Sequence, residues 1–136
     1  MKRARNLLVA NLIAQLAFGL LAMTLCLPSM QEWGDIFQAS QSTVQLTFSL
    51  YVLAYGGFQL VYGPMSDRYG RKPILLIGLF TLFLGATIAA FANSLETLLL
   101  GRFIQGAGGA AGMVVGRSMV QDLFHGPERT KVMAYV

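Results

Sequence analysis

The chain has 136 residues, of which 55% are hydrophobic and only 12% are charged. Water-soluble domains carry about twice that charged fraction, about 25%, so this composition, with a mean hydropathy of +0.59, excludes an ordinary soluble domain. The net charge is +4, but the cations are confined to particular loops, so we expect no nucleic-acid partner.

Four apolar runs are long enough to cross a hydrocarbon core of about 30 Å, which takes about 20 residues of α-helix. They cover residues 7–28, 44–63, 74–92 and 98–120, and a fifth run starts at about residue 132. None of them alternates apolar with polar residues as a membrane β-strand does. The sequence therefore predicts an all-α membrane protein with four transmembrane helices and the start of a fifth.

The loops between these runs differ in charge. One set of loops carries every loop cation: Lys2, Arg3, Arg5, Arg68, Arg71, Lys72, Arg129 and Lys131. The other set has no cation and carries the carboxylates Glu32, Asp35 and Glu96. Cytoplasmic loops are the ones enriched in Lys and Arg. We therefore expect a multi-pass protein of a bacterial-type inner membrane with its N-terminus in the cytoplasm.

The first run, 7–28, is longer than the roughly 7–15-residue apolar region of a secretory signal, so we expect a retained helix that ends at Pro28. At 100° per residue, four of its residues share one face: Asn11, Gln15, Ala22 and Cys26. Such a stripe faces the bundle interior or a water-filled cavity, or it hydrogen bonds a neighbouring helix. Asn11 and Gln15 are candidates for a cavity wall.

The second run, 44–63, carries an aromatic stripe on one face, formed by Phe48, Tyr51, Tyr55, Gln59 and Tyr62. Stripes at this spacing usually serve packing or lipid contact. The alternative is a cavity wall whose phenol and amide groups hydrogen bond a solute and whose ring faces attract cations. On that second interpretation the candidates are Tyr51, Tyr55 and Gln59.

The segment 63–73, between the second and third runs, is the densest in charge and reads GPMSDRYGRKP. We predict a short hairpin loop at the membrane surface, where its glycines permit a tight turn and its cations meet anionic lipid headgroups. The candidate functional residues are Gly63, Asp67, Arg68, Gly70, Arg71 and Lys72, with Asp122 at the same predicted end of the molecule.

The fourth run, 98–120, contains two arginines and many glycines. Arg102 lies about one turn inside one end of the run and Arg117 lies near the other end, while Gly108, Gly112 and Gly116 repeat every fourth residue, a pattern that lets helix backbones approach closely. An arginine at the membrane centre costs about 3 kcal/mol and marks a functional site by default. The alternative is a side chain that snorkels to the membrane surface. Gln105, one turn away, favours function for Arg102, and both interpretations stay open for Arg117.

Other motifs carry no chemistry that we can support. Residues 106–111 fit G-x-G-x-x-A, but a dinucleotide site needs a preceding strand and a βαβ unit, which an apolar helix does not supply. His125 has no second ligand near it in the sequence, so we expect no metal site. We accordingly expect no cofactor and no enzymatic activity.

Two of these stretches resemble motifs of the major facilitator superfamily. The segment 63–73 resembles the loop motif between its helices 2 and 3, and Leu98-x-x-x-Arg102-x-x-Gln105-Gly106 resembles its helix-4 motif. The stretches 42–47, 59–64 and 117–124 are similar to the Bcr/CflA branch of drug-resistance exporters.

The resemblance implies a transporter of about twelve helices in two six-helix halves, of which this chain would form the N-terminal third. Its partners would be membrane lipid, the remaining helices, a small-molecule substrate and protons. Asp67, Arg71 and Asp122 would latch a cytoplasmic gate, and Arg102 with Gln105 would link substrate and proton occupancy.

The chain departs from the branch in its length and in a missing acid. Members often carry an acid before Tyr-Leu-Pro, where this chain reads Thr24-Leu25-Cys26-Leu27-Pro28. No carboxylate then lies inside a complete predicted span, and arginine stays protonated, so it cannot carry a proton reversibly. Two alternatives remain: an uptake symporter of the same superfamily, and a stand-alone four-helix membrane protein that oligomerises through the glycines of 98–120 without transport.

Overall fold

The computed structural model describes the backbone of residues 2–135 and their side chains apart from those of 2–6, 16, 128, 131, 133 and 135. The predicted cations Lys2, Arg3, Arg5 and Lys131 lie outside the described side chains. The described chain forms six helices and no strand: α1 (Lys2–Thr24), α2 (Met30–Ile36), α3 (Gln41–Tyr69), α4 (Arg71–Ala90), α5 (Leu95–Leu123) and α6 (Gly126–Tyr135). The all-α prediction is confirmed.

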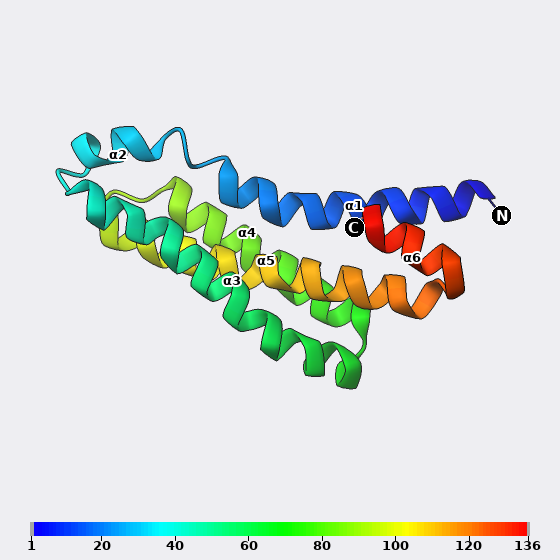
Figure 1. The fold of residues 1–136 in the computed structure, drawn as a ribbon. Helices are drawn as coiled ribbons and strands as arrows, with labels where there is room; N and C mark the ends of the chain where they lie inside the picture. Colours follow the sequence, from blue (N-terminus) through cyan, green and yellow to red (C-terminus); the bar gives the residue numbers. More distant parts are fainter. Residues whose placement is uncertain (1, 136) are drawn as a thin grey trace.

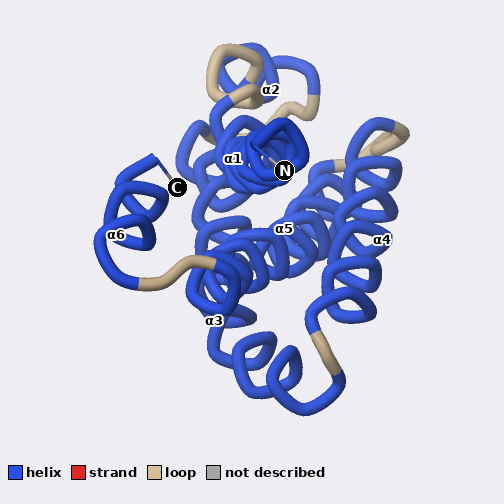
Figure 2. The backbone as a smooth tube through the Cα atoms, turned by 90° about the vertical axis from the view of Figure 1, so that its right-hand side faces the viewer, coloured by secondary structure: helices blue, strands red, loops and turns tan. Residues whose placement is uncertain are grey.

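The four long helices α1, α3, α4 and α5 run alternately up and down (Figure 1). The N-terminus, the α3–α4 break and the α5–α6 connection lie at one end, and α2 and the α4–α5 connection lie at the other. Viewed end-on, α5 occupies the centre (Figure 2). In its apolar window 56% of the residues are buried, against 12–22% in the other three. Within residues 2–135 these four helices are long and apolar enough to cross a membrane.

Two of the long helices begin at the same kind of serine cap. The hydroxyl oxygen of Ser40 accepts the backbone N–H of Thr43 at the start of α3, and Ser94 does the same for Thr97 at the start of α5, both at 3.3 Å. A capping serine satisfies one of the backbone donors that a helix start leaves free. These local signals fix where α3 and α5 start.

The first helix ends at Thr24, before the predicted end at Pro28. Proline lacks a backbone N–H, and it disfavours helical geometry in the residue before it. The chain therefore turns over residues 25–29 and forms the short helix α2 inside the predicted loop. Cys26 lies in that turn and is no longer on the helical face of Asn11 and Gln15.

The structure corrects the hairpin loop that was predicted for residues 63–73. Helix α3 continues through Pro64 to Tyr69, and α4 begins at Arg71, so that Gly70 alone separates the two helices. Gly70 has φ +96°, a backbone conformation that residues with a Cβ rarely adopt. The charged residues of the segment therefore stand on rigid helix ends.

Two further helix starts differ from the sequence prediction. Helix α5 begins at Leu95, which places Arg102 about two turns inside it at 3.6 residues per turn. Helix α6 begins at Gly126, ahead of the predicted start at about residue 132. Pro127 sits in its first turn, where a missing N–H costs nothing.

Glycines of α5 approach two neighbouring helices, α3 and α4, very closely. Toward α4, a Cβ on Gly108 would collide with the backbone of Leu82, and a Cβ on Gly101 would collide with the backbone of Ala89. Toward α3, a Cβ on Gly106 would collide with the carbonyl of Tyr51. Close contact is therefore spread around α5 and does not follow the predicted every-fourth-residue stripe.

Candidate functional site

An ion-pair cluster joins three helix ends next to the α3–α4 break. Arg71 donates from Nε to the carboxylate of Asp122 at 3.0 Å and from Nη1 to that of Asp67 at 2.5 Å. The same Nη1 donates to the hydroxyl of Ser66 at 2.7 Å, and Ser66 donates to the carbonyl of Gly63 at 3.0 Å. We call Ser66, Asp67, Arg71 and Asp122 the Arg71 cluster. It ties the first residue of α4 to the last turns of α3 and α5.

The ion pairs of the Arg71 cluster are open to solvent, whereas Ser66 is buried beneath them. The side chain of Arg71 is 26% exposed, that of Asp67 is 68% exposed and that of Asp122 is 53% exposed. Arg68, which lies 5.5 Å from the ring centre of Tyr69, and Lys72 are exposed beside it. Exposed ion pairs of this kind contribute about 0–1 kcal/mol, so this contact can break without unfolding the bundle.

A second arginine, Arg102, lies in the interior with 1% of its surface exposed. Its Nη1 donates to the side-chain oxygen of Gln105 at 2.7 Å and to the carbonyl of Ala22 at 3.1 Å. Its guanidinium carbon lies 4.5 Å from the ring centre of Tyr51, and the Tyr51 hydroxyl donates to the carbonyl of Gly19 at 2.9 Å. Helices α1, α3 and α5 therefore meet at this arginine. We call Ala22, Tyr51, Arg102 and Gln105 the Arg102 site.

Local sequence explains why Tyr51 reaches Arg102. Gly106 has no Cβ, and this lets the backbone of α3 approach α5 at Tyr51. Within the described side chains, Nε and Nη2 of Arg102 are buried and have no hydrogen-bond partner. Among the described side chains, therefore, only neutral groups contact this cation.

A cavity of about 270 Å³ lies beside the Arg102 site, between the α1–α2 turn, α2, α4 and α5. We call it the Arg102 cavity; it is lined by Cys26, Trp33, Ala86, Ala89, Ala90, Leu98, Arg102 and Gln105. The sequence analysis singled out Cys26, Arg102 and Gln105, but it gave no signal that α2 and Trp33 cover them.

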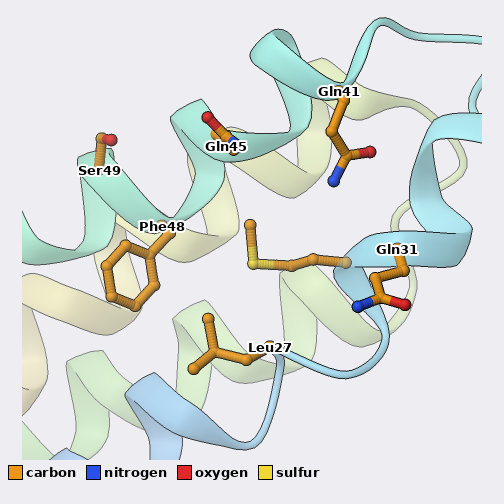
Figure 3. A pocket seen from close by; sticks show the side chains of 7 residues that line it. Leu27, Gln31, Gln41, Gln45, Phe48 and Ser49 are labelled. Carbon is orange, nitrogen blue, oxygen red and sulfur yellow. The ribbon is translucent and has the colours of Figure 1, made fainter.

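A second pocket, of about 360 Å³, lies between the α1–α2 turn, α2 and the start of α3, and it is lined by Leu27, Met30, Gln31, Gln41, Gln45, Phe48 and Ser49. Figure 3 shows Phe48 and Leu27 on one side of it and the amides of Gln31 and Gln41 on the other. Its lining carries no formal charge. The sequence does not predict this pocket, because the pocket depends on α2 and the sequence predicts a loop there.

The remaining predicted residues are dispersed. Gln15 donates to Asn11 within α1 at 2.6 Å. Tyr55 stacks on Tyr51 with ring centres 6.0 Å apart, while Gln59 is half-buried further along α3. Arg117 is exposed, so the structure does not bring it together with the buried Arg102.

Comparison with known proteins identifies the family to which these motifs belong. The family model described as Major Facilitator Superfamily matches residues 7–136. The chain belongs to the Major Facilitator Superfamily. It is therefore a multi-pass membrane protein of a transporter family, and Arg71 and Arg102 lie in the two stretches that resemble motifs of this superfamily.

Several superfamily relatives carry drug-resistance names. The chain is 35% identical over 133 residues to "Multidrug resistance protein D" of Escherichia coli, covering 97% of this chain and 33% of that protein. It is 33% identical over 132 residues to "Chloramphenicol resistance protein" of Pseudomonas aeruginosa, covering 95% and 32%. It is 38% identical over 112 residues to "Bicyclomycin resistance protein homolog" of Haemophilus influenzae, covering 81% and 28%. The chain thus spans about a third of the length of these relatives.

Proposed function

We propose that this chain forms the N-terminal third of a proton-coupled exporter of drugs or other small solutes in an inner membrane. The names of three relatives, each about three times as long, support export of a drug. The loop cations support a cytoplasmic N-terminus. On this proposal the transported solute, protons and the remaining superfamily helices are partners of the complete protein.

The Arg71 cluster carries the proposal. It joins α3, α4 and α5 at the end that also holds Arg68 and Lys72, which we assign to the cytoplasm. Alternating access requires contacts at one end that form and break in each cycle. A solvent-exposed ion pair worth about 1 kcal/mol or less meets that requirement, whereas a glycine-packed seam such as that between α4 and α5 does not. We assign Asp67, Arg71 and Asp122 to the latch of the cytoplasmic gate.

The Arg102 site has a different role in this proposal. Arg102 and Gln105 link substrate occupancy to proton occupancy, and Gly106 positions Tyr51 over the guanidinium. Arg102 remains protonated, so it acts by attracting or repelling charge and the carried proton resides on another group. Asn11, Gln15, Tyr55, Gln59 and Arg117 remain candidates for the solute path.

The glycines of α5 bear on the alternative of a stand-alone protein that oligomerises through them. Gly101, Gly106 and Gly108 each approach a neighbouring helix of the same chain so closely that a Cβ would not fit. They are therefore occupied within the chain. This supports a packed transporter domain over a stand-alone protein that oligomerises through those glycines.

The test uses the protein expressed from its complete reading frame in cells. We expect it to lower chloramphenicol accumulation and a proton uncoupler to abolish this effect. Asp67→Asn should abolish efflux while the protein still inserts in the membrane, because the latch loses one of its two carboxylates. Asp35→Asn, an exposed acid on α2, is the matched control and should keep efflux. Unchanged efflux in Asp67→Asn refutes the gate assignment, and proton-driven accumulation in place of efflux favours an uptake symporter.

A further inference from the structure

The buried Arg102 lacks an acidic partner among the described residues. The described carboxylates all lie on the exposed ends of the bundle: Asp67 and Asp122 at one end, and Glu32, Asp35 and Glu96 at the other. Its hydrogen bonds go to an amide oxygen and a backbone carbonyl, both neutral. Burying a cation without an opposite charge costs several kcal/mol. The position therefore calls for an anionic group that these residues do not supply.

The unpaired atoms have the geometry for such a group. Nε and Nη2 lie on one edge of the planar guanidinium, and both lack a partner among the described residues. Two parallel N–H bonds on one edge match the two oxygens of a carboxylate. Tyr51 covers a face of the guanidinium, and Nη1 is used by Gln105 and Ala22. We call the Nε–Nη2 pair the free edge of Arg102.

The Arg102 cavity provides room next to this arginine. Its volume is about 270 Å³, and a benzene molecule occupies a cavity of about 150 Å³, so one ring with a carboxylate fits. Trp33, Leu98 and the alanines of α4 supply apolar walls, whereas Arg102 and Gln105 supply the polar groups. Since the free edge is shielded from water, an ion pair formed there is stronger than one at the surface.

We propose that the Arg102 cavity binds a small carboxylate with an apolar body, whose two oxygens accept from the free edge of Arg102. Gln105 holds the guanidinium at Nη1. The free edge exposes almost no surface in this structure, so binding requires the side chain to turn that edge toward the cavity. The inference deepens the proposed export function by naming a class of solute, and it rests on that function only for the expectation that the bound solute is carried.

One reporter side chain lines the cavity. Cys26 is the one cysteine of this sequence. The test measures the rate at which N-ethylmaleimide modifies Cys26, followed by mass spectrometry of its peptide, in the complete protein in detergent micelles. The probe is benzoate, and benzamide is its neutral control. We expect benzoate to slow modification of Cys26 at least about threefold, whereas benzamide does not.

Variants connect this protection to the arginine. Arg102→Gln should abolish protection by benzoate, and Arg129→Gln, which removes an exposed cation of α6, should leave it intact. Gln105→Glu places a carboxylate oxygen where the amide oxygen now lies 2.7 Å from Nη1, so an internal acid should displace benzoate while the arginine remains. This second variant keeps the test valid if Arg102→Gln does not fold.

Three results would overturn the proposal: no protection of the unmodified protein by benzoate, equal protection by benzamide, or protection that persists in Arg102→Gln. Binding in micelles needs no gradient and no transport. A protein that exports chloramphenicol but gains no protection from benzoate keeps the proposed function and loses this inference. A protein that is protected but does not export loses only the proposed function.

Discussion

The two arginines Arg71 and Arg102 have opposite surroundings. Arg71 lies at a helix start, is 26% exposed and donates to two carboxylates and a hydroxyl. Arg102 lies in the middle of the bundle, is 1% exposed and contacts an amide, a carbonyl and an aromatic ring. The exposed cation pairs with two carboxylates, and the buried one has a free edge among the described residues.

This difference in surroundings indicates different roles for Arg71 and Arg102. Water competes for the groups around Arg71, so its ion pairs are weak enough to open and close. Water does not compete around Arg102, and burying it costs stability that its neutral neighbours only partly recover. On the proposals above, Arg71 joins helix ends in a latch, whereas Arg102 binds an anionic group. The predictions below separate these two jobs.

The largest effect is expected from Arg102→Met, which removes the buried charge and keeps a long apolar side chain. On the proposed export function, chloramphenicol efflux by the complete protein should fall at least about tenfold, which corresponds to about 1.4 kcal/mol. Folding stability should stay the same or rise by about 1–4 kcal/mol, as it does when buried ions are replaced by apolar side chains. Cell accumulation assays and thermal unfolding in micelles measure the two quantities.

Arg102→Lys completes that experiment, because lysine keeps the charge but lacks the planar fork. Efflux should be impaired in it as well. Normal efflux in either variant would show that the guanidinium is not required.

A steric change on α4 should disturb the Arg102 site without replacing any of its residues. In Gly85→Ala the new Cβ would collide with the backbone of Gln105 and lie 2.8 Å from the carbonyl of Gly101. Overpacking of this kind costs about 1–3 kcal/mol. Gly56→Ala is the matched control, since no atom lies within 4 Å of its Cβ, and it should be neutral or stabilising by up to about 1 kcal/mol. Equal melting temperatures for the two variants would contradict the packing described for α4 and α5.

A smaller effect is expected from Tyr51→Phe. The substitution removes the hydroxyl that donates to Gly19 at 2.9 Å and keeps the ring over Arg102, so it should lower the free energy of unfolding by about 1 kcal/mol. Tyr69→Phe, at an exposed tyrosine of the same helix, should change it less. Thermal unfolding of the purified variants checks this, and a larger loss in Tyr69→Phe would be inconsistent with it.

The smallest effect on stability is expected at the Arg71 cluster. Asp122→Asn removes an ion pair whose carboxylate is 53% exposed, so the free energy of unfolding should change by about 1 kcal/mol or less. Efflux should nevertheless fall, because the latch depends on that contact. A loss of stability as large as that of Gly85→Ala would mean that the cluster holds the fold together and is not a latch.

Much of the fold could be predicted from the sequence, because apolar length specifies a membrane-crossing helix without knowledge of its neighbours. The helix α2 could not, because seven residues are too few to show a period. The prediction of a loop over residues 63–73 is wrong, because Pro64 and the charged residues suggest a loop. A helix end in water tolerates a proline and charged residues, and only Gly70 separates the two helices.

Part of the candidate site could be predicted from the sequence, because that part depends on a single helix. Arg102 and Gln105 stand one turn apart on one helix, so their pairing follows from local spacing. The contacts of Arg102 with Tyr51 and Ala22 join residues far apart in the sequence and depend on how α1, α3 and α5 pack. Which neighbour each α5 glycine contacts likewise depends on how three helices pack around α5. The sequence pattern of one helix does not specify that packing.

The separation of the two jobs is tested most directly by benzoate protection of Cys26 in two variants of the complete protein. We expect Asp67→Asn to bind benzoate within about twofold of the unmodified protein, since the Arg102 site is intact, and Arg102→Gln to lose binding. Loss of protection in both variants would contradict the separation of the two sites, and its retention in both would contradict the assignment of the anion site to Arg102.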